Sequence, residues 1–409
     1  MDFLIASAAR ALAAGDPLGA LNRIALRGDA SALALRGIAM AQLGDFRRAK
    51  TLLRSAARGF DPKDAVSRAR CVVAEAEIAL VSRELAWPEK ALEAARAALD
   101  SHGDPENAIH ARHLQARRQL LIGRLDDAER ALAGLNAAAL APASRAIHEL
   151  IAAGIALRRL RMQPARAALA QAELAARHAG IPALTAEVES ASLVLSTPAA
   201  RLIGRGAQRP LLLDEVEALL GSDTLVVDAC RHAVREAGAV APLASRPVLF
   251  ALARALAEAW PRAAPRETLI VQAFRTAYFD ETHRARLRVE IGRLRAALRP
   301  VAGIAATRNG FALQPREGRE VVVLARPTED ADREHGAILA FLADGEAWSS
   351  SALALALNAS QRTVQRALDA LAAAGKVQSC GRGRARRWMT PPMPGFTTTL
   401  LLPAALAGR

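Results

Sequence analysis

The chain has very little lysine. Four of its 55 basic residues are lysines, namely Lys50, Lys63, Lys90 and Lys376, and the rest are arginines. Alanine and leucine are also abundant, a bias that a GC-rich genome produces throughout its proteins. The net charge of +14 therefore indicates a polyanionic partner only where the arginines are clustered. Such clusters lie at residues 284–299 and 376–387.

Cysteine is scarce and long apolar runs are missing. Cys71, Cys230 and Cys380 are widely spaced and form no CxxC pair, so we expect neither a disulfide framework nor a structural zinc site. No run approaches about 18 uncharged apolar residues, and the start, MDFLIASAAR, has no basic region. We therefore expect a cytoplasmic protein of bacterial type, with no membrane span, no export signal and no membrane partner.

Common catalytic signatures are absent as well. The sequence has no GxxxxGKS or GxxxxGKT phosphate loop, no HExxH and no GxSxG. His110 and His113 can share one helical face, but no carboxylate or third histidine completes a metal site by spacing. We expect no enzymatic activity, no cofactor and no metal, and only a nucleic-acid-processing activity without a recognisable site stays open.

Residues 1–197 are predicted to form an array of helical hairpins, because they are rich in helix-forming residues and interrupted by short Gly, Asp or Pro breaks. One set of offsets recurs at Gly44, Phe46, Ala49, Leu53 and Ala56, again at Gly123, Leu125, Ala128, Leu132 and Leu135, and in weaker copies around Ala20, Ala91 and Ala167. These offsets resemble those of tetratricopeptide repeats, in which a small residue lets two helices approach closely. The resemblance implies an α-solenoid of about five hairpins, and a generic bundle of helical hairpins is the alternative.

The most basic segment, residues 283–300, reads HRARLRVEIGRLRAALRP. On a period of 3.6 residues, one narrow buried stripe is formed by Leu287, Ile291, Leu294 and Leu298. Six arginines occupy the remaining surface, and Glu290 is the only acid in the segment. Such a helix is favoured next to a polyanion such as DNA. A solvated helix face in an arginine-rich protein is the alternative.

The elements around this helix are predicted in the order strands, three helices and hairpin. Short β-prone pieces lie at 224–243, helices follow at 246–260 and after Pro265, and Asn309-Gly310 indicates a hairpin turn. Residues 198–221, rich in Pro, Gly and Arg, are predicted to be a linker. Over residues 222–316 this order resembles the winged-helix output domain of bacterial response regulators, most specifically at VEIGRLR (289–295) and in the segment 307–313.

The resemblance implies that the arginine-rich helix predicted at residues 283–300, here called the arginine helix, enters the major groove of DNA and that the hairpin lies over the minor groove. It assigns base-edge or groove contacts to Arg286, Glu290 and Arg293, phosphate contacts to Arg284, Arg288 and Arg295, and a wing contact to Arg308. The carboxylate of Glu290 fits because it can accept a hydrogen bond from cytosine N4. Helical repeats rather than a phosphoacceptor receiver domain precede this module, so phosphorelay control is not carried over from the resemblance.

Residues 330–393 are predicted to form a second winged helix-turn-helix, which resembles the small winged helix of bacterial repressors. A helix at 334–342 precedes a serine-capped helix that ends at Asn358, and Ser360 caps a third helix. The third helix buries Val364, Ala367, Leu368 and Leu371. The DNA-contact candidates of this module are Gln361, Arg362, Thr363, Gln365, Arg366, Arg382, Arg384, Arg386 and Arg387. Residues 394–409 form a β-prone tail with no assigned function.

These patterns together predict a mainly α-helical protein, with an N-terminal α-solenoid of helical hairpins and two C-terminal winged-helix α+β domains. We expect a sequence-specific transcriptional regulator that binds double-stranded DNA as a homodimer. The groove of the helical repeats is expected to receive a protein or peptide ligand, or to mediate self-association. An interaction scaffold whose winged helices bind protein rather than DNA is the alternative.

Overall fold

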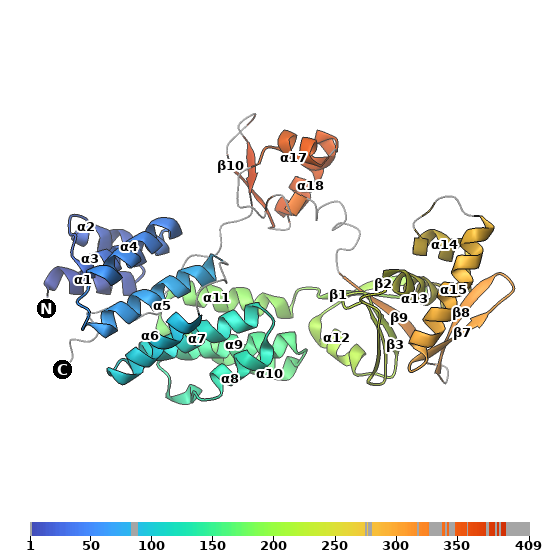
Figure 1. Cartoon of the computed structure of the whole chain (residues 1–409), viewed down its shortest axis with the longest axis horizontal. Coiled ribbons are helices and arrows are strands. Elements are labelled where there is room, and N and C mark those ends of the chain that lie inside the picture. Colours follow the sequence, from blue (N-terminus) through green and yellow to red (C-terminus); the bar gives the residue numbers. More distant parts are fainter. Residues whose placement is uncertain are drawn as a thin grey trace. The chain divides into compact units, whose positions relative to one another are not determined.

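The chain is mainly helical, as predicted, and its described strands begin only at residue 200 (Figure 1). The computed structural model describes residues 2–82, 89–274, 276, 280–316, 319–326, 338, 339, 342, 348–357, 359–373, 376–380, 383 and 386–389. The described residues fall into two compact units, one within Met1–Leu193 and the other within Val194–Pro391. Within the described part, no helix combines the length and the apolar character needed to cross a membrane.

The first unit consists of helices joined by short turns. Their bounds are α1 Phe3–Ala13, α2 Pro17–Ile24, α3 Ala30–Gln42, α4 Phe46–Gly59, α5 Ala65–Val81, α6 Glu89–Ser101, α7 Pro105–Leu121, α8 Leu125–Leu132, η1 Ala137–Ala139, α9 Pro142–Arg158, α10 Met162–Ala179 and α11 Pro182–Ser192, and the short helix η2, Leu193–Leu195, contains the boundary to the second unit. Aspartate carboxylates accept a backbone N–H of the first turn at Asp2, Asp16, Asp29, Asp45, Asp64 and Asp104. This cap satisfies an otherwise unpaired N–H, and the negative carboxylate interacts favourably with the positive end of the helix dipole. New helices therefore start at the Gly-Asp breaks of the sequence.

Consecutive helices pack as pairs, α1 with α2, α3 with α4, α5 with α6, α7 with α8 and α9 with α10. The small residues Ala20, Ala49 and Ala128, predicted to lie at helix crossings, are fully buried. A Cβ on Gly37 of α3 would lie 3.2 Å from the carbonyl oxygen of Ala49 in α4. The backbones of α3 and α4 therefore cross in close contact, and a larger residue at this point would separate them.

The two weaker copies of the repeat are displaced from their predicted positions. Ala91 and Ala167 are exposed, whereas Ala95 of α6 and Ala165 of α10 are buried. Both helices contain several alanines within one turn of each other, so the sequence alone does not distinguish the packed alanine from its neighbours.

Buried polar groups connect α5 to α7. Arg70 Nε donates to Asp104 Oδ2 at 2.8 Å, and His110 Nε2 lies 3.1 Å from Glu77 Oε2. All four side chains are almost completely buried. His113, one turn further along α7, is fully buried, and this burial lowers its pKa to about 2. His110 and His113 thus belong to the packed interior of the helical unit.

The second unit begins with a six-stranded mixed sheet in the order β2-β1-β9-β3-β4-β5. Its strands are β1 Ala200–Gly204, β2 Ala207–Leu211, β3 Leu225–Asp228, β4 Ala233–Glu236, β5 Ala239–Pro242 and β9 Val321–Ala325. Only β3 and β9 run parallel, and the other neighbours are antiparallel. The remaining elements are α12 Leu213–Leu220, α13 Pro247–Ala259, β6 Ala264–Pro265, α14 Arg266–Phe274, α15 Glu281–Leu298, β7 Ala302–Ala306 and β8 Gly310–Pro315. Strands β6, β8 and β7 form a second sheet in that order.

Residues 198–221, predicted to be a linker, form β1, β2 and α12 instead. Ile203 of β1 packs into the core of the second unit, and the strand pairs with β9, which lies beyond the predicted end of this module at residue 316. The sequence VVVLA of β9 is buried at every position. An unbroken apolar run of this kind is typical of a central strand that is buried on both faces. It shows no alternation of apolar and polar residues, which is the usual sequence signal of a strand. Strands β3, β4 and β5 lie within the range 224–243 that was predicted to be β-prone.

The C-terminal module contains α17 Ser350–Ala356, α18 Gln361–Ala373, β10 Gln378–Cys380 and β11 Arg387–Met389. The predicted caps are present, because Ser349 accepts the N–H of Ala352 and Ser360 that of Thr363, both at 3.1 Å. The predicted helix at 334–342 is described only at residues 338, 339 and 342, which are helical. Asn358 and the predicted β-prone tail, 394–409, lie outside the described residues.

Candidate nucleic-acid interface

Helix α15 is held in the second unit by the four residues predicted from its periodicity. Leu287, Ile291, Leu294 and Leu298 are each at most 1% exposed. The helix starts at Asp280, whose carboxylate accepts the backbone N–H of His283 at 3.1 Å. Hydrogen bonds from the side chain and backbone of His283 lower the pKa of Asp280. A capped start and a continuous buried stripe give the helix one fixed orientation, so its other faces point to solvent.

One flank of α15 carries arginines that share a single acid. Arg284 Nη1 lies 3.3 Å and Arg288 Nη2 3.0 Å from the carboxylate of Glu281 in the first turn. The side chain of Arg288 is nevertheless 67% exposed. Glu281 lies two residues before the basic segment 283–300, so the composition of that segment does not reveal it. It positions two cations without burying either of them.

The opposite flank carries Arg286 and Arg293. Arg293 Nη1 donates to Glu290 Oε1 at 2.8 Å, and its side chain is 65% exposed, whereas that of Glu290 is only 13% exposed. The guanidinium of Arg286 lies 4.4 Å from the ring centroid of Phe274 in α14. Glu290, predicted to contact a base edge, therefore orients Arg293 in this structure.

Between the two arginine flanks, α15 exposes a ridge of small residues that the sequence analysis missed. Ala285, Val289, Gly292 and Ala296 lie opposite the buried stripe and are all exposed. Val289 is 54% exposed. Small residues on the outermost face let the backbone of a helix approach a partner closely, and the flanking arginines can then reach groups on either side. The signal was present, because these four residues share the spacing of the buried stripe.

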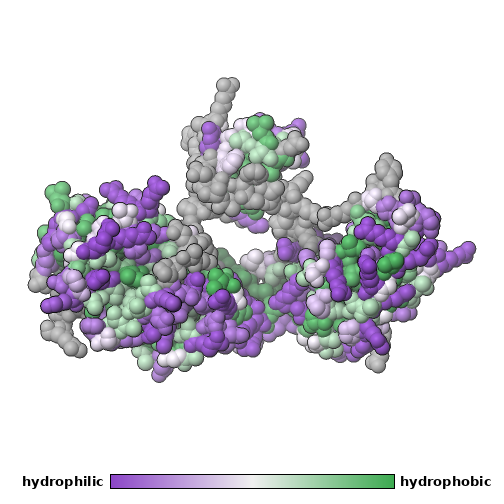
Figure 2. All heavy atoms as spheres, in the orientation of Figure 1, coloured by the Kyte–Doolittle hydropathy of each residue, from purple (hydrophilic) through white to green (hydrophobic). Residues whose placement is uncertain are grey.

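Strands β7 and β8 form the predicted hairpin, whose tip is hydrophilic on the visible face (Figure 2). Arg308 is exposed at the turn. Arg266 of α14 supports this turn by donating to the carbonyl oxygens of Arg308, at 2.7 Å, and Thr307, at 3.1 Å. Gly310 lies against β6, where a Cβ would approach the carbonyl oxygen of Ala264 to 1.9 Å.

Arg295 connects the helix to the hairpin. Its Nε donates to the carbonyl oxygen of Ile304 in β7 at 2.9 Å, and its guanidinium lies 5.9 Å from the ring centroid of Phe311 in β8. Arg295 was predicted to contact phosphate, and here it has an additional structural role. Arg246, directly before α13, joins Glu290 and Arg293 around a hollow of about 490 Å³. Its position beside the arginine helix could not be read from the sequence.

In the C-terminal module, the predicted stripe of α18 is buried at Val364, Ala367, Leu368 and Leu371. Arg362 and Arg366 are exposed on the same helix, together with Gln361. Gln361 Nε2 donates to Ser350 Oγ at 3.3 Å and Gln365 Nε2 to Asp369 Oδ1 at 3.0 Å, while the hydroxyl of Thr363 lies 2.8 Å from that of Ser360. Helix α18 thus presents two arginines among polar side chains that are held locally.

The basic turn of this module is described in part. Arg386 lies 3.8 Å from Asp369 of α18 and 4.2 Å from the ring centroid of Trp388, which is fully buried. Arg387 is the first residue of β11. Arg382 and Arg384 lie outside the described residues. Arg386 therefore fastens the strand pair to α18 as well as adding positive charge.

No family model, curated protein or solved structure matches the chain. The functional argument consequently rests on the geometry of the residues themselves.

Proposed function

We propose that the chain is a transcriptional regulator that binds double-stranded DNA in a sequence-specific manner. The observation that carries this proposal is the surface of α15, where two flanks of exposed arginines border a ridge of small residues. A helix of this kind fits the major groove, because the ridge can approach base edges while the flanks reach the phosphates. The rigid attachment of its other face supports a defined orientation on the duplex.

The order of elements supports a finer interpretation of the fold. A sheet, the helices α13, α14 and α15 and the hairpin β7–β8 follow one another as in the winged helix of response regulators. The C-terminal module has the helix, turn, helix and strand pair of a second, smaller winged helix. The paired helices of the first unit, with small residues at their crossings, support a solenoid similar to tetratricopeptide repeats.

Each arginine group then has a distinct role. Arg284 and Arg288 neutralise phosphates, Arg286 and Arg293 reach base edges, and Arg308 contacts the backbone beside the minor groove. Arg295 contributes to phosphate binding and keeps the hairpin in register with α15. Arg362, Arg366 and the basic turn of the C-terminal module extend the contact. A cytoplasmic homodimer would present these surfaces twice, as a palindromic operator requires.

The test is a fluorescence anisotropy titration of the full chain on the promoter of its own operon and on a scrambled duplex, at several salt concentrations. Arg288→Ala should make the slope of log K, where K is the association constant, against log salt concentration less steep by about 0.9 on both duplexes, because that is the contribution of one phosphate contact. Arg293→Ala should cost about 1–3 kcal/mol on the promoter alone. Arg47→Ala, an exposed arginine of α4, removes the same charge and should change neither.

The outcome also separates the regulator from an interaction scaffold. A scaffold whose winged helices bind protein would show no preference for the promoter, and Arg288→Ala and Arg47→Ala would then behave alike. Equal affinity for the promoter and the scrambled duplex overturns sequence-specific binding.

A further inference from the structure

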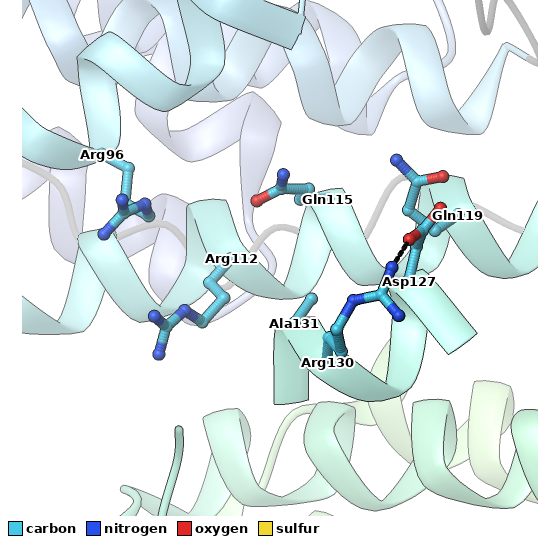
Figure 3. A pocket seen from close by; sticks show the side chains of 7 residues that line it. All are labelled: Arg96, Arg112, Gln115, Gln119, Asp127, Arg130 and Ala131. Atoms are coloured by element: carbon cyan, nitrogen blue, oxygen red, sulfur yellow. Dashed lines mark hydrogen bonds and ion pairs between the residues drawn. The ribbon is translucent and has the colours of Figure 1, made fainter. Parts of the chain in front are cut away.

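Arginines line a hollow in each of the two units. In the first unit, Arg96, Arg112 and Arg130 line a hollow of about 410 Å³ between α6, α7 and α8 (Figure 3). Two of these arginines already have counter-ions, because Arg96 pairs with Asp100 and Arg130 pairs with Asp127. In the second unit, a hollow of about 490 Å³ lies between the start of α13 and α15, the helix proposed to bind DNA. The hollow of the second unit is therefore the one that bears on that function.

The side chains around the hollow of the second unit carry a net charge of +1. Its charged lining residues are Arg246, Arg293 and Glu290, and its other lining side chains are apolar. Glu290 is already bonded to Arg293 at 2.8 Å. Arg246 is exposed and has no acidic partner within the described part of the chain. A phosphodiester carries one negative charge, whereas a phosphomonoester carries about 1.5–2 at pH 7, so the charge of the hollow suits a phosphodiester.

The main chain holds Arg246 in a fixed place beside this hollow. Its backbone N–H donates to the carbonyl oxygen of Leu243 at 2.9 Å, and its own carbonyl oxygen accepts the N–H of Phe250 at 3.0 Å. Leu243 and Phe250 belong to the same buried core as Leu294 of α15. The backbone of Arg246 is thus fixed relative to α15, and its exposed side chain can reach an anion in the hollow without a change of the backbone.

The hollow lies on one side of the exposed ridge of α15. At about 100° per residue, Arg293 lies about 40° around the helix from Val289, and Glu290 lies about 100° away in the same direction. Arg288 lies about 100° away in the opposite direction. When the ridge faces the base edges, the two sides of the helix face the two strands that border the major groove. Arg284 and Arg288 then meet one strand, and the hollow adjoins the side that faces the other.

We propose that this hollow binds one phosphodiester of the second strand, with Arg246 as the donor. The planar guanidinium of Arg246 can bind two phosphate oxygens through parallel hydrogen bonds. Arg293 lies between this phosphate and the ridge, so the contact fixes the register in which Arg293 meets a base edge. The inference rests on the proposed function, and it adds a DNA-contacting residue that lies outside α15.

The test measures the affinity of the full chain for the promoter of its own operon and for a scrambled duplex, by fluorescence anisotropy at several salt concentrations. Arg246→Ala should make the slope of log K against log salt concentration less steep by about 0.9 on both duplexes, and Arg246→Lys should keep the wild-type slope. Arg112→Ala, which removes an arginine from the hollow of the first unit, is the matched control and should leave the slope unchanged.

A scan of the promoter with methylphosphonates then identifies the strand. Each methylphosphonate removes the charge of one phosphate, and the wild-type chain should lose affinity at positions on both strands. Arg246→Ala should become insensitive to the substitution at a phosphate of one strand, and Arg288→Ala at a phosphate of the other strand.

An unchanged slope for Arg246→Ala, or insensitivity of both variants on the same strand, overturns the inference while promoter binding by the wild-type chain still stands. Equal affinity of the wild-type chain for the two duplexes overturns sequence specificity alone, because the slope still reports the contact of Arg246. A wild-type chain that binds neither duplex overturns both.

Discussion

Gly310→Ala provides the sharpest test of how the hairpin beside α15 is built. A Cβ at this position would lie 1.9 Å from the carbonyl oxygen of Ala264, 2.8 Å from its carbonyl carbon and 3.1 Å from Cα of Pro265. All three atoms belong to the backbone, so no side-chain rotation can relieve the contact. Since Cβ atoms essentially never approach another atom within 3.0 Å, β6 and β8 must separate by about 1.1 Å.

The expected loss of stability follows from the bonds at this junction. The separation breaks the pairing of Ala264 with Phe311 and of Pro265 with Gly310, and it weakens the bond from Arg266 N to Asn309 O, now 3.2 Å. Two to three backbone hydrogen bonds at about 1 kcal/mol each predict a local destabilisation of about 2–3 kcal/mol. The hairpin should also lose its fixed position relative to α15, and promoter affinity should fall with it.

Hydrogen exchange with mass spectrometry measures this locally, through peptides that cover residues 300–316. Gly303→Ala in the same sheet is the matched control, because its Cβ would meet Gln314 only at ordinary van der Waals distances, the side-chain Oε1 at 3.4 Å and the carbonyl oxygen at 3.8 Å. We expect faster exchange in the hairpin for Gly310→Ala and little change for Gly303→Ala. Unchanged exchange in both variants would refute the close approach of β6 to β8.

Three further predictions address α15 and the helical unit. Gly292→Ala meets no atom within 4 Å and should raise stability by about 0.5–1 kcal/mol in urea unfolding, because alanine favours the helix; a loss would mean that this face is covered. Val289→Ala should weaken binding to promoter DNA but not to the same duplex with uracil in place of thymine, if Val289 contacts a thymine methyl group. Burial lowers the pKa of His113 to about 2 in the folded protein, whereas the ordinary pKa of histidine is 6.5. Below pH 6.5 the unfolded chain therefore binds one more proton than the folded chain, and the free energy of unfolding should fall by up to about 1.4 kcal/mol per pH unit on acidification. His113→Leu should reduce that slope in urea titrations at pH 7 and 5.5, and an unaltered slope would contradict this account.

Periodicity predicted those parts of the fold that depend on one amphipathic face. The buried stripes of α15 and α18 and the serine caps at Ser349 and Ser360 follow directly from local chemistry. Strand β9 was missed, because it pairs with β1 and β3, which lie about a hundred residues earlier in the sequence. Long-range pairing of this kind leaves no local signal. For the same reason residues 198–221 were predicted to be a linker, although β1 in this segment pairs with β9.

The sequence predicts which residues form the candidate interface, but not which contacts hold their side chains in place. The sequence identified the arginines of α15, but it could not show that Glu281 holds two of them or that Arg295 bonds to β7. These contacts depend on side-chain directions and on the return of the chain after the helix. The ridge around Val289 was predictable, because its small residues recur at the same spacing as the buried stripe of α15.

The ion pairs of α15 reconcile a strongly basic helix with a folded protein. Without them, Arg284 and Arg288 would repel each other across one turn, whereas Glu281 attracts both. Exposed pairs of this kind are worth at most about 1 kcal/mol, so a phosphate can replace the carboxylate at little cost. In the proposed complex, binding to phosphate would also release counter-ions from DNA. Glu281 therefore holds the arginines in place in the free protein, and the proposed DNA association would exchange its carboxylate for phosphates.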